Sequence, residues 1–174
     1  MHRSLNLKRV PLEVNMNHIK AVLFDLDNTI LDRTRTFDRF TNLFIQNYFQ
    51  NMESTQDIFN RIIELDQDGY KDTLIQHGKI NQLGIRDDFD LIIVSEEAGI
   101  KKPDPGIFNM ALEKLQLEPK ECIFVGDHPV NDIEGAAKAG METIWIQVNQ
   151  PWRDEITAKP LHSIRKVGEL LEIL

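Results

Sequence analysis

The sequence predicts an α/β fold with a doubly wound parallel sheet, because apolar runs of strand length alternate with helix patterns and acidic residues follow two of the runs. The runs lie at residues 19–24 (IKAVLF), 91–94 (LIIV), 122–125 (CIFV) and 143–148 (TIWIQV). Continuous apolar runs are typical of strands that are covered on both faces of a parallel sheet. Parallel strands joined by helices imply right-handed crossovers, and ligands then bind beyond the carboxyl ends of the strands.

Two helices are expected between the later strands. Residues 105–117 carry apolar side chains at helical spacing, Asp104 can cap the first turn, and a proline occupies the first helical position. Residues 131–139 form a second helix pattern, with Asn131 as its cap and Gly140 as its terminator. These helices would connect three parallel strands in succession.

The segment after the first strand differs from the rest of the chain. Residues 34–66 contain two amphipathic helix patterns with no strand between them, so we interpret them as an insertion above the sheet. We therefore divide the chain into an N-terminal extension (1–18), a core (19–32 and 74–174) and a small, incomplete helical cap (33–73).

Composition excludes several functional classes. The 174 residues suit one domain, and a net charge of −8 argues against general nucleic-acid binding, which relies on Lys and Arg. No apolar run approaches ~18 residues, so no membrane span is predicted. Cys122 is the single cysteine, which fits a reducing cytoplasm, and residues 1–17 lack the apolar stretch of a secretory signal. We expect a cytoplasmic monomer or homodimer.

Four aspartates are expected to meet at the carboxyl edge of the sheet. Asp25 and Asp27 follow the first strand, and strand alternation places both on the same side if the chain stays extended. Asp127 follows the 122–125 strand, and Asp132 comes five residues later at the start of a helix. Two like charges ~4 Å apart repel by ~4 kcal/mol near a protein surface, so the set favours a bound cation, although each aspartate alone could simply end a strand or cap a helix. Oxygen ligands without Cys or His favour Mg²⁺ over zinc.

A positive counterpart lies in the loop at residues 99–105 (GIKKPDP). Two prolines stiffen this loop, which would hold Lys102 toward the carboxylates. A Lys-Lys-Pro sequence by itself is usually a solvated turn, but beside an acidic strand end we interpret Lys102 as a phosphate-binding residue. His128 is expected to be exposed.

Three ordered motifs carry a family resemblance: DLDNTI at 25–30, GIKKPDPGIF at 99–108 and GDHPVNDIEGAAKAGM at 126–141. Together they resemble the haloacid dehalogenase (HAD) superfamily, in the phosphatase branch with a helical cap inserted after the first strand. The resemblance implies a HAD-like Rossmannoid core and a Mg²⁺-dependent phosphohydrolase that acts on a small phosphorylated metabolite.

The resemblance also implies a role for each acidic residue. Asp25 would be the nucleophile that forms an aspartyl-phosphate, and Asp27 the acid and then the base. Lys102 would steady the nucleophile and the phosphoryl charge. Asp127 would bind Mg²⁺ with Asp25 and the backbone carbonyl of Asp27, supported by Asp132. Dehalogenases of the superfamily lack the acid that matches Asp27, so a dehalogenase is not expected.

The sequence departs from the family pattern in one place. The family has a further strand, ending in a phosphate-binding Ser or Thr, before the 91–94 strand, and residues 67–78 contain no apolar run of that length. Thr73 is the only nearby candidate for the hydroxyl. Either the protein lacks this segment or the printed sequence omits it. We favour the omission, which predicts a spatial break between consecutive Cα atoms across residues 67–78.

Two other interpretations remain. A catalytically impaired HAD-like remnant with a binding or regulatory role would follow from a real loss of the strand. A phosphoacceptor receiver domain also pairs strand-end acids with a lysine, but receivers lack an inserted helical cap, so we rank it low.

Overall fold

Four parallel strands form one sheet in the part of the chain that the structure describes. The computed structural model describes residues 16–49, 55–66, 73–148 and 150–174. The strand order is β1-β2-β3-β4, and each neighbouring pair is parallel. The strands are β1 (Ala21–Phe24), β2 (Cys122–Gly126), β3 (Glu142–Ile146) and β4 (His162–Ile164). The predicted α/β class with a parallel sheet is confirmed.

Both faces of the sheet are covered, as expected for a doubly wound fold. Alternation along β2 directs Cys122 and Phe124 into one apolar layer and Ile123 and Val125 into the other. Helices α5 and α6 pack in the first layer, while the C-terminal segment η4 supplies Leu170 to the second. The C-terminal tail thus packs on the core as a 3₁₀ helix. These elements are α5 (Pro105–Leu115), α6 (Gly135–Lys138) and η4 (Val167–Glu172).

Helix α5 begins as predicted. The carboxylate of Asp104 accepts a hydrogen bond from the amide of Gly106 at 2.8 Å, and Pro105 occupies the first helical position. The helix places Ile107, Phe108, Ala111 and Leu112 in the core.

The second connecting helix begins earlier than predicted. The chain forms a π-helical segment, η3 (Pro129–Glu134), immediately before α6. Its cap is His128, whose Nδ1 accepts hydrogen bonds from the amides of Val130 and Asn131 at 3.2 and 3.1 Å. The predicted cap at Asn131 is therefore wrong, because a proline that suits the first helical turn follows His128 directly. Gly140 follows the end of α6 with φ +83°, as the sequence indicated.

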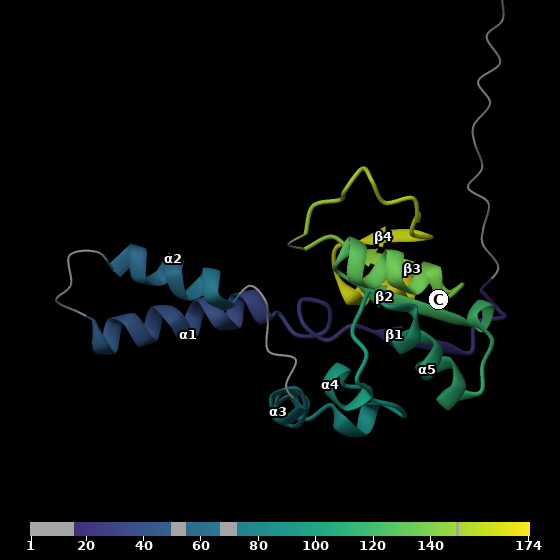
Figure 1. Cartoon of the computed structure of the whole chain (residues 1–174), viewed down its shortest axis with the longest axis horizontal. Helices are drawn as coiled ribbons and strands as arrows, with labels where there is room; N and C mark the ends of the chain where they lie inside the picture. The colour runs from purple at the N-terminus through teal and green to yellow at the C-terminus, as the bar shows by residue number, and fades with distance from the viewer. Residues whose placement is uncertain (1–15, 50–54, 67–72, 149) are drawn as a thin grey trace, which may run out of the picture.

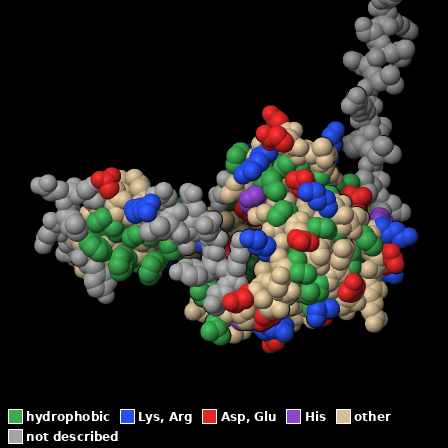
Figure 2. All heavy atoms as spheres, in the orientation of Figure 1, with side chains coloured by type: hydrophobic (Ala, Val, Ile, Leu, Met, Phe, Trp, Pro, Cys, Tyr) green, Lys and Arg blue, Asp and Glu red, His purple; other side chains and the backbone are tan. Residues whose placement is uncertain are grey.

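Two helices form a lobe at one side of the core (Figure 1). They are α1 (Arg33–Tyr48) and α2 (Thr55–Asp66), which lie side by side and correspond to the two predicted amphipathic helices. Phe37, Phe40 and Phe44 stack along α1 with ring centroids 6.3 and 6.1 Å apart. Phe40 remains 59% exposed. Figure 2 shows hydrophobic side chains gathered on the lower side of this lobe.

Residues 91–94 are not part of the sheet, so the strand predicted there is wrong. Within the described residues β1 pairs only with β2, and no strand lies against its other edge. Residues 91–94 consequently have no neighbouring strand with which to form a ladder. All of β1 is half-buried, whereas all of β2 is buried, which reflects the open edge. The predicted break across residues 67–78 falls mainly on 67–72, which lie outside the described residues.

The remaining elements are short. β4 was not predicted, because its three residues (HSI) carry no apolar run. No helix among the described residues is long and apolar enough to cross a membrane. The other helices are α3 (Thr73–Leu83), α4 (Ser95–Ala98), η1 (Arg86–Asp88) and η2 (Pro119–Glu121).

Candidate active site

The parallel register of β1 and β2 brings the predicted acids together. Phe24 pairs with Val125, and the amide of Asp25 donates to the carbonyl of Val125 at 2.9 Å. Asp25 and Asp127 therefore leave the sheet at the same carboxyl edge. Carboxylate oxygens of Asp25, Asp127 and Asp132 all lie within 4.8 Å of one another. The sequence prediction that these three residues form one cluster is consistent with this geometry.

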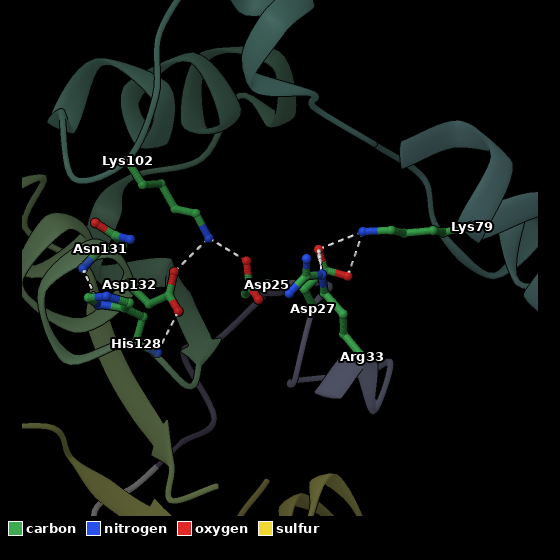
Figure 3. Close-up of polar contacts among 8 residues, drawn as sticks. All are labelled: Asp25, Asp27, Arg33, Lys79, Lys102, His128, Asn131 and Asp132. Carbon is green, nitrogen blue, oxygen red and sulfur yellow. Dashed lines mark hydrogen bonds and ion pairs between the residues drawn. The ribbon is translucent and has the colours of Figure 1, made fainter. Parts of the chain in front are cut away.

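Lys102 links two of these carboxylates. Its Nζ donates to Oδ1 of Asp25 at 2.5 Å and to Oδ1 of Asp132 at 2.6 Å (Figure 3). The same ammonium lies 5.3 Å from the ring centroid of Phe124, a favourable position for a cation over an aromatic face. The proline-containing loop before α5 thus brings Lys102 into the acidic cluster, where the sequence analysis placed it.

The backbone at the end of β2 requires a residue without a side chain. A Cβ at Gly126 would lie 2.5 Å from Cβ, Cγ and Oδ2 of Asp132, which is closer than real Cβ contacts. The absence of a side chain lets η3 approach β2, and Asp132 is then only 1% exposed. Its Oδ2 accepts a hydrogen bond from the amide of His128 at 2.9 Å. Gly126 therefore serves the close approach of Asp132, a role that the sequence alone did not reveal.

Burial and crowding change the titration of the cluster. Burial, with the charges of Asp132 and Asp25, raises the pKa of Asp127 to about 7. Burial and the charge of Asp25 raise the pKa of Asp132 to about 6, although Lys102 opposes the shift. Burial alone would lower the pKa of Lys102, but the neighbouring Asp132 and Asp25 raise it overall. The lysine is thus a permanent cation, while the buried acids resist being charged together.

Asp27 faces away from this cluster. Beyond Asp25 the chain bends, so the extended geometry assumed in the sequence analysis does not persist, and Asp27 turns toward the helices. Its two oxygens accept hydrogen bonds from Nζ of Lys79 on α3 at 2.9 and 2.7 Å. Nε of Arg33, the first residue of α1, lies 3.8 Å from Oδ2 (Figure 3). The carboxylate of Asp27 is not one of the three clustered acids.

Sequence reasoning missed both cations that contact Asp27. Lys79 is 52 residues away along the chain and occupies no recognisable motif. Arg33 lies six residues after Asp27, and its proximity in sequence was the one available signal.

Two other expectations are corrected by the structure. His128, expected to be exposed, is half-buried as the cap of η3, and burial with the charges of Arg153 and Lys102 lowers its pKa. Thr73, the candidate hydroxyl, begins α3, where its amide donates to Glu96 at 2.6 Å. Thr73 does not line the cavity beside Asp25.

A cavity of about 650 Å³ opens at this site. One end holds Asp25, Lys102 and Asp127, and the cavity continues along the free edge of β1 toward Lys20. Residues 88–95 line the opposite side. In Figure 1, α3 and α4 lie on the side of β1 that faces away from β2.

Comparison with known proteins identifies relatives of this chain. Residues 70–146 match the family model described as haloacid dehalogenase-like hydrolase. A glyceraldehyde 3-phosphate phosphatase of Pyrococcus furiosus is 29% identical over 99% of this chain and 68% of its own length. A phosphoserine phosphatase of Thermus thermophilus is 35% identical over 57% of this chain and 38% of its own length. The chain therefore spans between about a third and two thirds of the length of these curated relatives.

A solved structure shares the same fold. The HAD phosphatase of Thermococcus onnurineus superposes with a TM-score of 0.59 at 23% identity, over 89% of this chain and 97% of that chain. The family model, the related sequences and the common α/β core agree with the motifs found in the sequence. The chain is thus similar to the haloacid dehalogenase-like hydrolases in the family model that matches residues 70–146 and in its related sequences, and it shares their fold.

Proposed function

We propose that this chain is a Mg²⁺-dependent phosphohydrolase that acts on a small phosphorylated metabolite, with Asp25 as the nucleophile. The observation that carries the proposal is the position of Asp25 beside Lys102 and two buried acids, Asp127 and Asp132. A carboxylate held at a strand end beside a fixed cation is placed to attack an electrophilic phosphorus. The names of the two relatives, phosphatases of three-carbon phosphate esters, support this substrate class.

The donor set fits a hard divalent cation. Three carboxylates meet within 4.8 Å, and their burial and mutual repulsion raise the pKa values of Asp127 and Asp132, so a cation would relieve the crowding. All available ligands are oxygens, which suit Mg²⁺. We assign the site to Asp25, Asp127 and Asp132, with Asp27 contributing its backbone carbonyl. When bound, Mg²⁺ would neutralise charge on the phosphoryl oxygens.

The chain's own residues account for the remaining chemistry. An oxygen of Asp25 forms a bond to phosphorus while the bond from phosphorus to the leaving oxygen breaks. Asp27 gives its proton to that leaving oxygen, and then accepts a proton from the water that cleaves the aspartyl-phosphate. Lys102 stays charged throughout and holds the Asp25 carboxylate in position.

The contact between Asp27 and Lys79 bears on the first step. The ammonium of Lys79 donates to both oxygens of Asp27, whereas in the first step an oxygen of Asp27 must face the leaving oxygen. We infer that the contact opens when substrate enters, which requires α3 to move relative to β1. We assign residues 33–73, which include α1 and α2, as the cap that shapes the substrate site, residues 1–18 as an extension, and a cytoplasmic location.

The proposal is tested by trapping the phosphorylated protein. After incubation with p-nitrophenyl phosphate and Mg²⁺ and an acid quench, intact mass should show one added phosphate. Hydroxylamine should remove it, as expected for an acyl phosphate, and Asp25→Asn should carry none. Turnover without a trapped phosphate in a rapid-quench time course, or a phosphate retained by Asp25→Asn, would contradict Asp25 as the nucleophile.

A catalytically impaired protein that binds Mg²⁺ or phosphate without turnover is the second candidate. The observation in its favour is the edge of β1 that no other strand pairs with among the described residues, where the family pattern has a strand that ends in a phosphate-binding hydroxyl. If Mg²⁺ stabilises the wild-type chain but aryl phosphates are not hydrolysed above the rate of Asp25→Asn, this second function is the correct one.

A further inference from the structure

Two cations contact the carboxylate of Asp27 outside the acidic cluster. Nζ of Lys79 on α3 donates to both oxygens of Asp27 at 2.9 and 2.7 Å, and Nε of Arg33 lies 3.8 Å from Oδ2. Figure 3 shows Lys102 and Lys79 on opposite sides of Asp25 and Asp27. The site therefore has two separate positive regions, one at the acidic cluster and one beside Asp27.

The position of Asp27 decides which positive region meets the alcohol part of a phosphate ester. If Asp27 protonates the leaving oxygen, as in the proposed function on which this inference rests, that oxygen lies within about 3 Å of a carboxylate oxygen of Asp27. Because Nζ of Lys79 is 2.9 and 2.7 Å from these two oxygens, it lies within roughly 6 Å of the leaving oxygen. A group two or three atoms along the alcohol therefore comes within reach of Lys79.

The cavity extends to this second positive region. Asp27 and Arg33 line the cavity, and so do Gln76 and Ile80 of α3. Gln76 lies about one turn before Lys79 on the helix, and Ile80 follows it directly. The cavity thus offers space beside Asp27 for the alcohol part of a substrate, with α3 as one of its walls.

Lys79 needs another anionic partner whenever Asp27 turns to the leaving oxygen. Its side chain is only 19% exposed, and Asp27 is the one carboxylate with which it forms an ion pair in the described part of the chain. A largely buried ammonium without a counter-ion is unfavourable, because it has lost hydration and gains no attraction in exchange. An anion on the substrate can replace Asp27 there. A carboxylate matches the contact that is replaced, in which the ammonium binds both oxygens of one carboxylate.

We propose that the substrate is the phosphate ester of a short hydroxy acid, whose carboxylate binds Lys79 while its phosphoryl group lies beside Asp25 and Lys102. Arg33 adds a second positive charge on the same side of Asp27 as the carboxylate. The carboxylate carbon lies two or three atoms from the ester oxygen. Lys79 passes from Asp27 to the substrate, which frees Asp27 to face the leaving oxygen. An ester of a neutral alcohol leaves Lys79 on Asp27, so it binds more weakly and reacts more slowly.

A matched pair of esters tests the wild-type chain. 3-Phosphoglycerate carries a carboxylate, and glycerol 3-phosphate has the same three carbons with a hydroxymethyl group in its place. We expect kcat/KM with Mg²⁺ to be roughly tenfold or more higher for 3-phosphoglycerate, as one charge-assisted hydrogen bond supplies. Equal values for the two esters, or a preference for glycerol 3-phosphate, would overturn the proposal.

Variants place the carboxylate at Lys79. Lys79→Met removes the charge and keeps the length of the side chain, Lys79→Arg keeps the charge, and Lys114→Met is a control at an exposed lysine of α5. We expect Lys79→Met to raise KM for 3-phosphoglycerate about tenfold and to change kcat/KM for p-nitrophenyl phosphate less than about twofold. Lys79→Arg and Lys114→Met should keep the preference for 3-phosphoglycerate. If Lys79→Met lowered kcat/KM equally for all three esters, Lys79 would only hold Asp27 in place, and the proposal would be wrong.

Binding to the Asp25→Asn variant separates the carboxylate site from the chemistry. This variant lacks the nucleophile, so calorimetric titration in the presence of Mg²⁺ measures binding alone. We expect the Kd of 3-phosphoglycerate to be about tenfold lower than that of glycerol 3-phosphate. If the wild-type chain does not hydrolyse p-nitrophenyl phosphate, the proposed phosphohydrolase is wrong, but the titration still decides the carboxylate site. Equal Kd values, or no binding of either ester, would exclude that site.

Discussion

Replacing Asp127 by Asn should stabilise the metal-free protein at high pH. The substitution keeps the shape of the side chain and removes a negative charge that burial and the neighbouring carboxylates make unfavourable in the folded state. Asp127 is only 6% exposed, and burial with the charges of Asp132 and Asp25 raises its pKa from 3.8 to about 7. At ~1.4 kcal/mol per pH unit between these two values, holding the charged carboxylate lowers the free energy of unfolding by roughly 4 kcal/mol.

The pH dependence gives the sign of the effect. A raised pKa means that the folded state binds the proton more tightly, so wild-type stability falls as pH rises from about 4 to about 7. Asp127→Asn lacks this dependence. Its advantage should be roughly 4 kcal/mol at pH 8 but only about 1 kcal/mol at pH 4.5, because that pH lies less than one unit above the unfolded-state pKa of 3.8.

Urea unfolding in EDTA, followed by tryptophan fluorescence, measures the difference. With a slope of ~2 kcal/mol per molar urea, the midpoint at pH 8 should rise by ~2 M. Excess Mg²⁺ should reverse the order, because it binds only the folded wild-type site. A variant no more stable than wild type at pH 8, or a difference that does not change with pH, would refute the argument.

Further changes test the other parts of the site. Hydrolysis of p-nitrophenyl phosphate should require Mg²⁺ and stop with EDTA, and activity that survives the chelator would exclude the metal assignment. Asp25→Asn should reduce turnover to background while circular dichroism stays unchanged; retained turnover would point to another nucleophile. Asp27→Asn should slow alkyl phosphates more than p-nitrophenyl phosphate, because a poor leaving group depends more on the acid, and equal losses in kcat would argue against this role. Gly126→Ala should lower the free energy of unfolding by ~1–3 kcal/mol, because the added Cβ clashes with Asp132. In the control Gly168→Ala the added Cβ has no atom within 4 Å, so the free energy of unfolding should change little. If urea unfolding gave similar losses for both variants, the close approach of Asp132 to Gly126 would not be the cause.

The sequence predicted most of the framework because its signals are local. β1, β2 and β3 are continuous apolar runs, and α5 carries both its spacing and its cap in consecutive residues. The shared carboxyl edge of β1 and β2 then follows from parallel pairing. This is why the sequence alone predicts that Asp25, Asp127 and Asp132 lie together.

The sequence-based predictions were wrong or incomplete where the local structure depends on residues far away in the sequence or on a choice between neighbouring helix starts. Residues 91–94 have the composition of a buried strand, but a strand exists only where a neighbour pairs with it, and the described residues provide none. Lys79 reaches Asp27 from 52 residues away, and no pattern around Lys79 indicates a partner. The cap at His128 reflects a competition between two possible starts of one helix, which composition does not decide.

The register of the sheet also implies an order of assembly for the site. β2 and β3 pair across a short connection, from Ile123 to Glu142, while Ala21 of β1 pairs with Cys122, about a hundred residues further along the chain. Contacts between residues close in sequence form faster, since less chain entropy is lost in closing the loop. We therefore expect Asp127 and Asp132 to be in place before Asp25 arrives with β1, so the nucleophile joins its site in a late step of folding.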